Sequence, residues 1–141
     1  MKKLIALSVA LFLIVSCFTV NTLAAEKKTQ VAAAKSAKVE VYYFHFTRRC
    51  VTCQAVETET QAAITALYPI QIKKGLVTFK AVNLDEKTSE ALAKKCNAEG
   101  QALLVISGGK RIDLTEQGFM YAKSSPVKLK AELKKTIDPF L

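Results

Sequence analysis

The sequence predicts an α/β fold in which helices flank a mixed four-stranded sheet, in the order βαβ, α, ββα. A run of β-branched and aromatic residues at 39–46 changes to apolar residues at three- and four-residue steps, which indicates a strand leading into a helix. A second apolar strand follows, and a Gly-Gly pair later separates two further strand-like runs. The chain has 141 residues, 50% of them hydrophobic, which suffices for one domain with a core.

Residues 1–24 have the pattern of a signal peptide, with Lys2 and Lys3, an apolar run from Leu4 to about Val20, and small residues at 24–25. A rival interpretation rests on Ile14-Val15-Ser16-Cys17, which resembles a lipobox and would lipidate Cys17 as a membrane tether. Both interpretations predict export to the periplasm or cell envelope, where disulfide exchange is a normal task.

Residues 25–37 are rich in Ala and Lys without an apolar stripe, so we expect a flexible tether ahead of a folded domain at 38–141. The chain is basic, with a formal net charge of +9. The positive residues are scattered, mostly as pairs on the polar sides of expected helices, and few aromatic residues lie among them. This pattern predicts a solvated surface and no nucleic-acid partner.

The first half of the domain is expected to be a βαβ unit and a short helix. The apolar stripe that begins at Cys53 and reaches Leu67 predicts a helix that Pro69 ends. Residues 76–84 predict a strand parallel to the first, because the connection is a helical crossover. Residues 85–88 then cap a short helix at 89–97, on which Cys96 is expected to pack as a small hydrophobic residue.

The second half begins with strands at 102–107 and 110–114, which Gly108-Gly109 joins as a hairpin. We expect a loop at 116–124. Ser125 as N-cap and Pro126 at the first helical position then predict a terminal helix with Leu129, Leu133 and Ile137 on one face.

Cys50 and Cys53, here called the CxxC pair, fall where the first strand ends and the helix begins. A structural zinc site would need four ligands, and the chain has no second pair of this kind. Redox exchange needs only one thiolate that attacks a disulfide and a second thiol within reach. The helix dipole, with Arg48 and Arg49 beside it, favours the Cys50 thiolate.

The order of elements, with CxxC after the first strand, resembles the thioredoxin superfamily in its minimal form over residues 38–141. Residues 42–57 also resemble the signature YYFH…RCxTCxxxE of small exported proteins of the nitrophenyl compound nitroreductase subunit ArsF family. The resemblance implies that Cys50 attacks, that Cys53 resolves, and that they form a redox-active disulfide with no other cofactor. As part of a nitroreductase system, such a chain would relay electrons to another subunit.

The sequence departs from the thioredoxin pattern around the pair. Thioredoxins bury an Asp that accepts a proton six positions before the first cysteine, and this position is Phe44 here. Ala81 replaces a nearby Lys. Ala102 replaces the cis-proline of the substrate loop, where Gln101 precedes it, so we expect a trans peptide. Glu57 and His45 are then the candidates to take the Cys53 proton.

Three hypotheses of function remain open. The first is an exported thiol–disulfide oxidoreductase or thiol electron relay that acts on a protein or small-molecule partner. The second is a carrier of a soft metal or metalloid bound by Cys50 and Cys53, with His45 as a third ligand. The third is an interaction module of thioredoxin fold whose disulfide is structural. Oligomeric state is not predicted.

Overall fold

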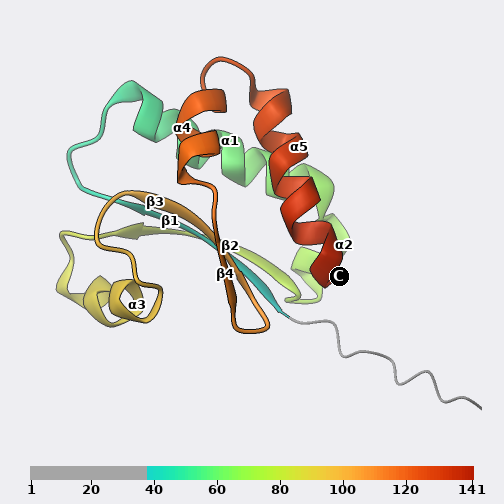
Figure 1. Cartoon of the computed structure of the whole chain (residues 1–141), viewed down its shortest axis with the longest axis horizontal. Coiled ribbons are helices and arrows are strands. Elements are labelled where there is room, and N and C mark those ends of the chain that lie inside the picture. Colours follow the sequence, from blue (N-terminus) through green and yellow to red (C-terminus); the bar gives the residue numbers. More distant parts are fainter. Residues whose placement is uncertain (1–37) are drawn as a thin grey trace, which may run out of the picture. The chain divides into compact units, whose positions relative to one another are not determined.

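A computed structural model describes residues 38–141 of the chain. The predicted signal peptide at 1–24, the tether at 25–37 and the Cys17 lipidation site lie outside the described residues. Figure 1 shows the elements, which follow one another as β1 (Val39–His45), α1 (Val51–Leu67), α2 (Pro69–Lys73), β2 (Val77–Asn83), α3 (Glu90–Lys95), β3 (Ala102–Ser107), β4 (Lys110–Asp113), α4 (Thr115–Tyr121) and α5 (Pro126–Ile137). Short 3₁₀ turns precede α3 at Lys87–Ser89 and follow α5 at Asp138–Phe140.

The four strands form one mixed sheet in the order β2-β1-β3-β4. β1 pairs in parallel with β2 and antiparallel with β3, and β3 pairs antiparallel with β4. The helical crossover α1 therefore joins parallel neighbours, as predicted. The side chains of β1 are buried in cores on both faces of the sheet, which explains its almost unbroken apolar sequence. The predicted α/β class, a small thioredoxin-like arrangement, is confirmed.

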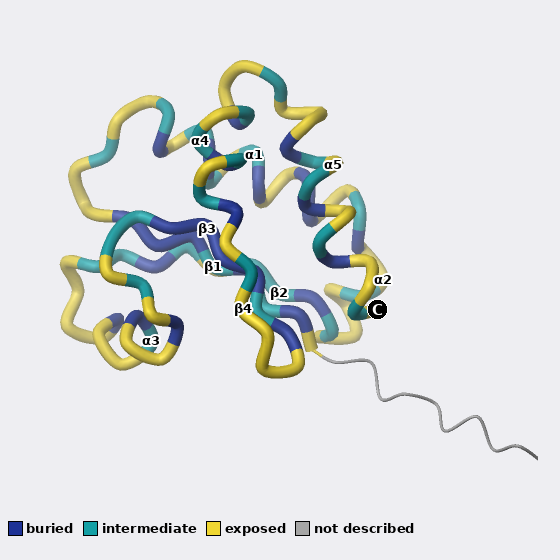
Figure 2. Tube along the Cα trace, viewed as in Figure 1, coloured by how far each residue is buried: buried dark blue, intermediate teal, exposed yellow. Residues whose placement is uncertain are grey.

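Helices α1, α4 and α5 lie on one side of the sheet and α3 on the other (Figure 1), and each face has its own core. Alternate residues of β1 point to opposite faces, so Val41 and Tyr43 pack under α1, α4 and α5, whereas Phe44 packs on the α3 side. Figure 2 shows the buried positions concentrated along the sheet strands and on the helix sides that face them. On the α3 side the core contains Cys96, 3% exposed, which packs as a small hydrophobic residue as predicted.

The predicted hairpin is present between β3 and β4. Gly108 and Gly109 have φ values of +56° and +80°, and Ser107 pairs with Lys110 across them. Two successive residues with positive φ make the turn whose twist matches that of the strands, and glycine adopts this conformation without a steric cost.

Two helices were not predicted. Pro69 ends α1 as expected, but it also begins the short helix α2, whose Ile70 is exposed. The loop predicted at 116–124 is wrong, because Thr115–Tyr121 forms α4. Glycine disfavours a helix interior, but a Cβ at Gly118 would lie 3.1 Å from Leu103 Cδ2 and 3.4 Å from Val56 Cγ1. Here tertiary packing selects glycine so that α4 can approach the sheet closely.

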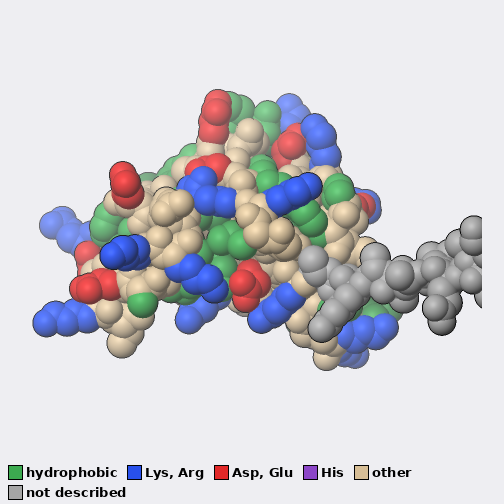
Figure 3. All heavy atoms as spheres, turned by 60° about the horizontal axis from the view of Figure 1, so that its bottom comes forward, with side chains coloured by type: hydrophobic (Ala, Val, Ile, Leu, Met, Phe, Trp, Pro, Cys, Tyr) green, Lys and Arg blue, Asp and Glu red, His purple; other side chains and the backbone are tan. Residues whose placement is uncertain are grey.

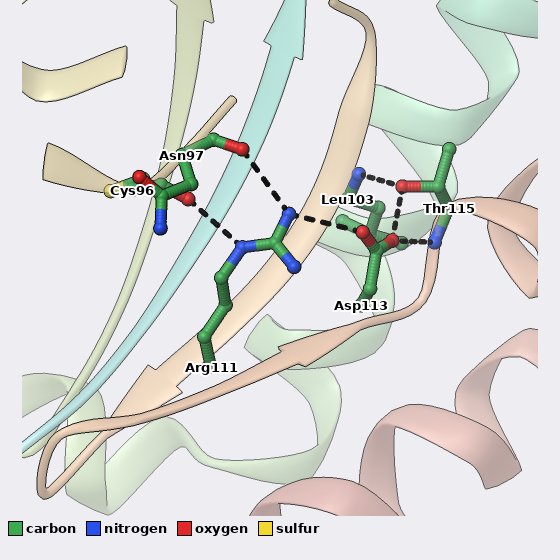
Figure 4. A network of polar contacts seen from close by, with 6 residues as sticks. All are labelled: Cys96, Asn97, Leu103, Arg111, Asp113 and Thr115. Carbon is green, nitrogen blue, oxygen red and sulfur yellow. Dashed lines mark hydrogen bonds and ion pairs between the residues drawn. The ribbon is translucent and has the colours of Figure 1, made fainter. Parts of the chain in front are cut away.

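A polar network ties the hairpin to the helices on both sides of it (Figure 4). Arg111 donates from Nε to the Cys96 carbonyl at 2.9 Å and pairs through Nη2 with Asp113 at 3.1 Å. Asp113 accepts from the Thr115 backbone N–H at 3.0 Å, and the Thr115 hydroxyl in turn accepts from the Leu103 N–H at 3.0 Å. The end of α3 and the start of α4 are thereby held to opposite ends of one short strand.

The surface is charged without a single basic patch on the face shown in Figure 3, where Lys and Arg side chains lie apart and Asp and Glu side chains lie among them. None of the helices within residues 38–141 has both the length and the apolarity needed to cross a bilayer.

Candidate functional site

Cys50 occupies the N-cap of α1. Its backbone is extended, with φ −76° and ψ 167°, and its Sγ accepts a hydrogen bond from the Cys53 N–H at 3.3 Å. An N-cap side chain normally supplies an oxygen to these unpaired helix N–H groups, and here a sulfur takes that position. The predicted placement of the CxxC pair at a helix N-terminus is correct.

The exposed Cys50 thiol has its pKa lowered from the ordinary value. The largest cause is a side-chain hydrogen bond from Cys53, followed by the backbone N–H of Cys53. Both hydrogen bonds stabilise the thiolate, which is the nucleophilic form of cysteine. The geometry at the start of α1 therefore produces an accessible, activated sulfur.

Cys53, one helical turn further, is only 4% exposed. Its Sγ lies 3.6 Å from Gln101 Oε1, an acceptor in the loop before β3. One S–H proton can serve either Gln101 or the Cys50 thiolate, so Cys53 can exchange partners as the state of Cys50 changes. Both cysteines are free thiols in this structure, and the redox-active disulfide stays a prediction.

The two arginines before Cys50 have different surroundings. Arg49 forms an ion pair with Glu57, a half-buried residue of α1, whereas Arg48 is exposed. The ion pair holds Glu57 against the start of its own helix and offsets much of the Arg49 charge. We expected the arginine charges to lower the Cys50 pKa. The main cause is instead the hydrogen bonds from Cys53, which the sequence alone could not rank.

The loop that carries the arginines is anchored to the end of β2. The Thr47 N–H donates to Asp85 Oδ2 at 2.8 Å, and Asn83 Nδ2 donates to the Thr47 hydroxyl at 2.9 Å. The hydrogen bond from the Thr47 N–H is the largest cause of the lowered pKa of Asp85. These contacts between the carboxyl ends of two parallel strands hold the approach to Cys50 in one position.

The contacts of His45 involve neither cysteine of the CxxC pair. It is 8% exposed, and its Nδ1 is 3.0 Å from the Phe46 carbonyl oxygen. It lines a cavity of about 360 Å³ on the β2 and α3 side, and neither cysteine lines that cavity. Within residues 38–141, no three His, Cys, Asp or Glu side chains come together as a metal-binding group, so the structure does not bring His45 to the CxxC pair.

The substrate loop and the surface around Cys50 are partly apolar. Ala102 begins β3 opposite Phe44 and is 7% exposed, and every peptide bond within 38–141 is trans, including the one before Ala102. Val51 is 67% exposed and Phe46 is 39% exposed. Two apolar side chains thus flank Cys50 in sequence and are available to a partner, with the exposed Arg48 between them.

Sequence reasoning missed Tyr43. The count of six positions back from Cys50 indicated Phe44, but Phe44 packs on the opposite face of the sheet with Val82 and Ala93. Tyr43 is the residue of β1 that faces α1, and it is fully buried. Strand alternation from Val39 and Val41 could have identified it, because positions 39, 41 and 43 must share one face.

No protein-family model matches this chain, and no curated protein matches it either.

Proposed function

We propose that this chain is an exported thiol–disulfide oxidoreductase or thiol electron relay of the thioredoxin superfamily, with Cys50 as the attacking thiol and Cys53 as the resolving thiol. One observation carries the proposal. An exposed cysteine with a lowered pKa caps a helix, and a buried thiol of the next turn donates to it. Accessibility and thiolate character are the two properties that separate reactive cysteines from structural ones.

The reaction follows from the two positions. The Cys50 thiolate attacks one sulfur of a partner disulfide, forms a mixed disulfide and releases the other partner sulfur as a thiolate. Cys53 loses its proton and attacks Cys50 Sγ, which forms the Cys50–Cys53 disulfide and releases the second partner thiolate. Two electrons pass to the partner, and the reverse sequence would oxidise a partner dithiol.

Stabilisation of the Cys50 thiolate has a consequence for the direction of exchange. A lowered pKa stabilises the reduced protein relative to its disulfide, which makes that disulfide more oxidising. The exposed Val51 and Phe46 support a partner that presents an apolar segment beside its sulfur. The exposed Arg48 between them favours an acidic group on the same segment.

The test is the reduction potential of the CxxC pair, measured against glutathione with metals chelated. We expect a value between about −120 and −270 mV, the range of working exchange catalysts. The Cys53→Ser variant should accumulate a mixed disulfide on Cys50, and Cys50→Ser should form none. Cys96→Ala is the matched control, because Cys96 is buried on the other side of the sheet and should leave both results unchanged.

A potential below about −300 mV would instead indicate a structural disulfide and would contradict the proposal. Failure of the pair to close a disulfide, together with stoichiometric binding of a soft metal ion lost in Cys50→Ser, would support the carrier hypothesis in its place.

A further inference from the structure

Tyr43 carries a buried hydroxyl group that has no hydrogen-bond partner among residues 38–141. The residue is 0% exposed and sits in the middle of the central strand, between Ala81 of β2 and Leu103 of β3. A buried donor without an acceptor costs stability, and a phenylalanine would fill the same space without that cost. Thr60 and Ser107 also carry such hydroxyls among the described residues, but Tyr43 is the one on the strand that leads to the CxxC pair, where a role in the reaction is one explanation.

Tyr43 lies on the face of the sheet that α1 covers, and Cys53 is a buried residue of that helix. Tyr43 packs in the core beneath α1, where Val56 is one turn beyond Cys53 on the inner side of the helix. The charged and titratable groups that act on its hydroxyl are Cys53, Arg49, Cys50 and Glu57, in that order of effect. The His45 ring lies 5.8 Å from the Tyr43 ring, between centroids, on the same strand.

The protonation state limits what Tyr43 can do. Burial, and next to it the nearby Cys53 sulfur, raises the pKa of Tyr43 far above its ordinary value. The phenol therefore stays protonated at every pH at which cysteines exchange, and it can act as a hydrogen-bond donor but not as a base. A group that becomes negative during the reaction would supply the acceptor that the Tyr43 hydroxyl lacks.

We propose that the Tyr43 hydroxyl donates a hydrogen bond to the Cys53 sulfur as that sulfur becomes a thiolate in the resolving step. This inference rests on the proposed exchange function. The Cys53 thiol donates to Gln101 Oε1, and this contact is lost when the thiol loses its proton. The Tyr43 O–H then donates to the negative Cys53 sulfur. Tyr43 thus takes the position facing the pair that the count of residues had assigned to Phe44.

The step balances without a further reactant. When Cys50 attacks the partner disulfide, the first partner sulfur leaves as a thiolate and takes the proton of the Cys53 thiol. The Cys53 thiolate, held by the Tyr43 O–H, attacks Cys50 Sγ. The bond between Cys50 and the partner breaks, and the second partner sulfur leaves with the electron pair. Tyr43 keeps its own proton throughout.

The test compares Tyr43→Phe with the wild-type full chain in stopped-flow reaction with oxidised glutathione, in which capture and resolution are followed separately. Capture by Cys50 should be unchanged. Resolution should slow by about 10- to 100-fold, the effect of losing a hydrogen bond to a charged group. The pH profile of resolution should move to higher pH by about one to two units for the same reason.

A structural role alone would not produce those changes, and thermal unfolding gives a second, independent readout. Removal of the orphaned hydroxyl should raise the Tm of the dithiol protein by about 4 °C or more, since it removes an unsatisfied buried group. Tyr42→Phe is the matched control. Tyr42 is the neighbouring tyrosine of β1, packs against the core on the opposite face of the sheet, and should change neither resolution rate nor its pH profile.

The outcomes separate this inference from the proposed function. If wild-type protein captures and resolves the glutathione disulfide while Tyr43→Phe does both at the same rates and with the same pH profile, the Tyr43 inference is wrong and the exchange function stands. If wild-type protein forms no mixed disulfide at Cys50, the exchange function fails first and the inference fails with it.

Discussion

The two cysteines of the CxxC pair have opposite surroundings although only two residues separate them. Cys50 caps α1 and faces solvent, whereas Cys53 has entered the helical turn that faces the sheet and is 4% exposed. The position along the helix produces this difference, because Cys50 is the N-cap residue that precedes the first turn, whereas Cys53 lies within that turn on the buried side of α1. A nucleophile and a protected second thiol result from one backbone conformation.

The Cys50 thiol should titrate below the ordinary cysteine value of about 8.5. A lowered pKa means that the thiolate, and with it the rate of alkylation by iodoacetamide, reaches its plateau at a lower pH. Cys53→Ala removes the side-chain hydrogen bond that is the largest cause, so the midpoint of the profile should rise toward the ordinary value. Equal midpoints in the two proteins would show that the Cys53 side chain is not the cause.

α4 depends on a close approach that one residue permits. Gly118 lies over Leu103 and Val56, both fully buried side chains of β3 and α1. The helix brings no long side chain to this position, so its backbone can lie close to the sheet. Glycine destabilises a helix interior, and the close packing of α4 against Leu103 and Val56 offsets this loss.

Gly118→Val should destabilise the protein by about 2–3 kcal/mol, because the added atoms overpack the contact with Leu103 and Val56. Gly100→Val is the matched control. Gly100 has no atom within 4 Å of an added Cβ, so its substitution should change stability by no more than about 0.5 kcal/mol. Urea denaturation of both variants measures the difference, and equal losses would contradict the packing explanation.

Asp113 should stabilise the start of α4 only while it is ionised. Burial alone would raise its pKa, but the hydrogen bonds from the Thr115 hydroxyl and N–H outweigh burial and leave the pKa lowered. The stabilisation is therefore complete above the unfolded value of about 3.9 and is lost as the pH falls through the folded value. Asp113→Ala should cost about 0.5–1 kcal/mol at pH 7, because the exposed carboxylate accepts from the N–H of Thr115, the first residue of α4, without being the N-cap residue.

The same reasoning predicts how that difference depends on pH. Guanidinium unfolding of Asp113→Ala and wild-type protein, followed from pH 7 to pH 2, should give stabilities that converge in acid. A difference that stays constant over this range would mean that the carboxylate charge contributes nothing to the hydrogen bonds from Thr115.

The two cores of the described domain share β1. Val41 and Tyr43 belong to the core beneath α1, α4 and α5, and Phe44 belongs to the core on the α3 side. Loss of either core removes one face of the strand that pairs with both β2 and β3. We therefore expect the described domain to unfold as one cooperative unit.

Leu133→Ala tests this cooperativity. Leu133 of α5 is 0% exposed, so the variant should lose about 2–5 kcal/mol through lost burial and a residual cavity. Circular dichroism and tyrosine fluorescence should still report coincident urea transitions. Val127→Ala, at an 81% exposed position of the same helix, should stay within about 0.5 kcal/mol of wild-type protein. Separate transitions for the two probes would contradict a shared core.

Local patterns along the chain were sufficient to predict all four strands, the parallel pairing of β1 with β2, the hairpin and the position of the CxxC pair at a helix N-terminus. Each depends on a periodicity or a turn signal within a few residues, such as Gly108-Gly109 between two strand-like runs. The same signals failed for Thr115–Tyr121, which forms α4 where we expected a loop. Propensity describes the isolated segment, and packing against Leu103 and Val56 outweighed it.

The surroundings of the CxxC pair depend on contacts between distant segments. Strand register turns Tyr43 rather than Phe44 toward α1, and a loop 48 residues beyond Cys53 brings Gln101 to its sulfur. The pairing of Arg49 with Glu57 likewise changes the expected role of both residues. Residue types and spacing determine which segments form and which thiol leads a helix. Which groups meet that thiol is set by how the strands and helices pack, because hydrogen bonds and charges act over a few ångströms in space, whatever the separation in sequence.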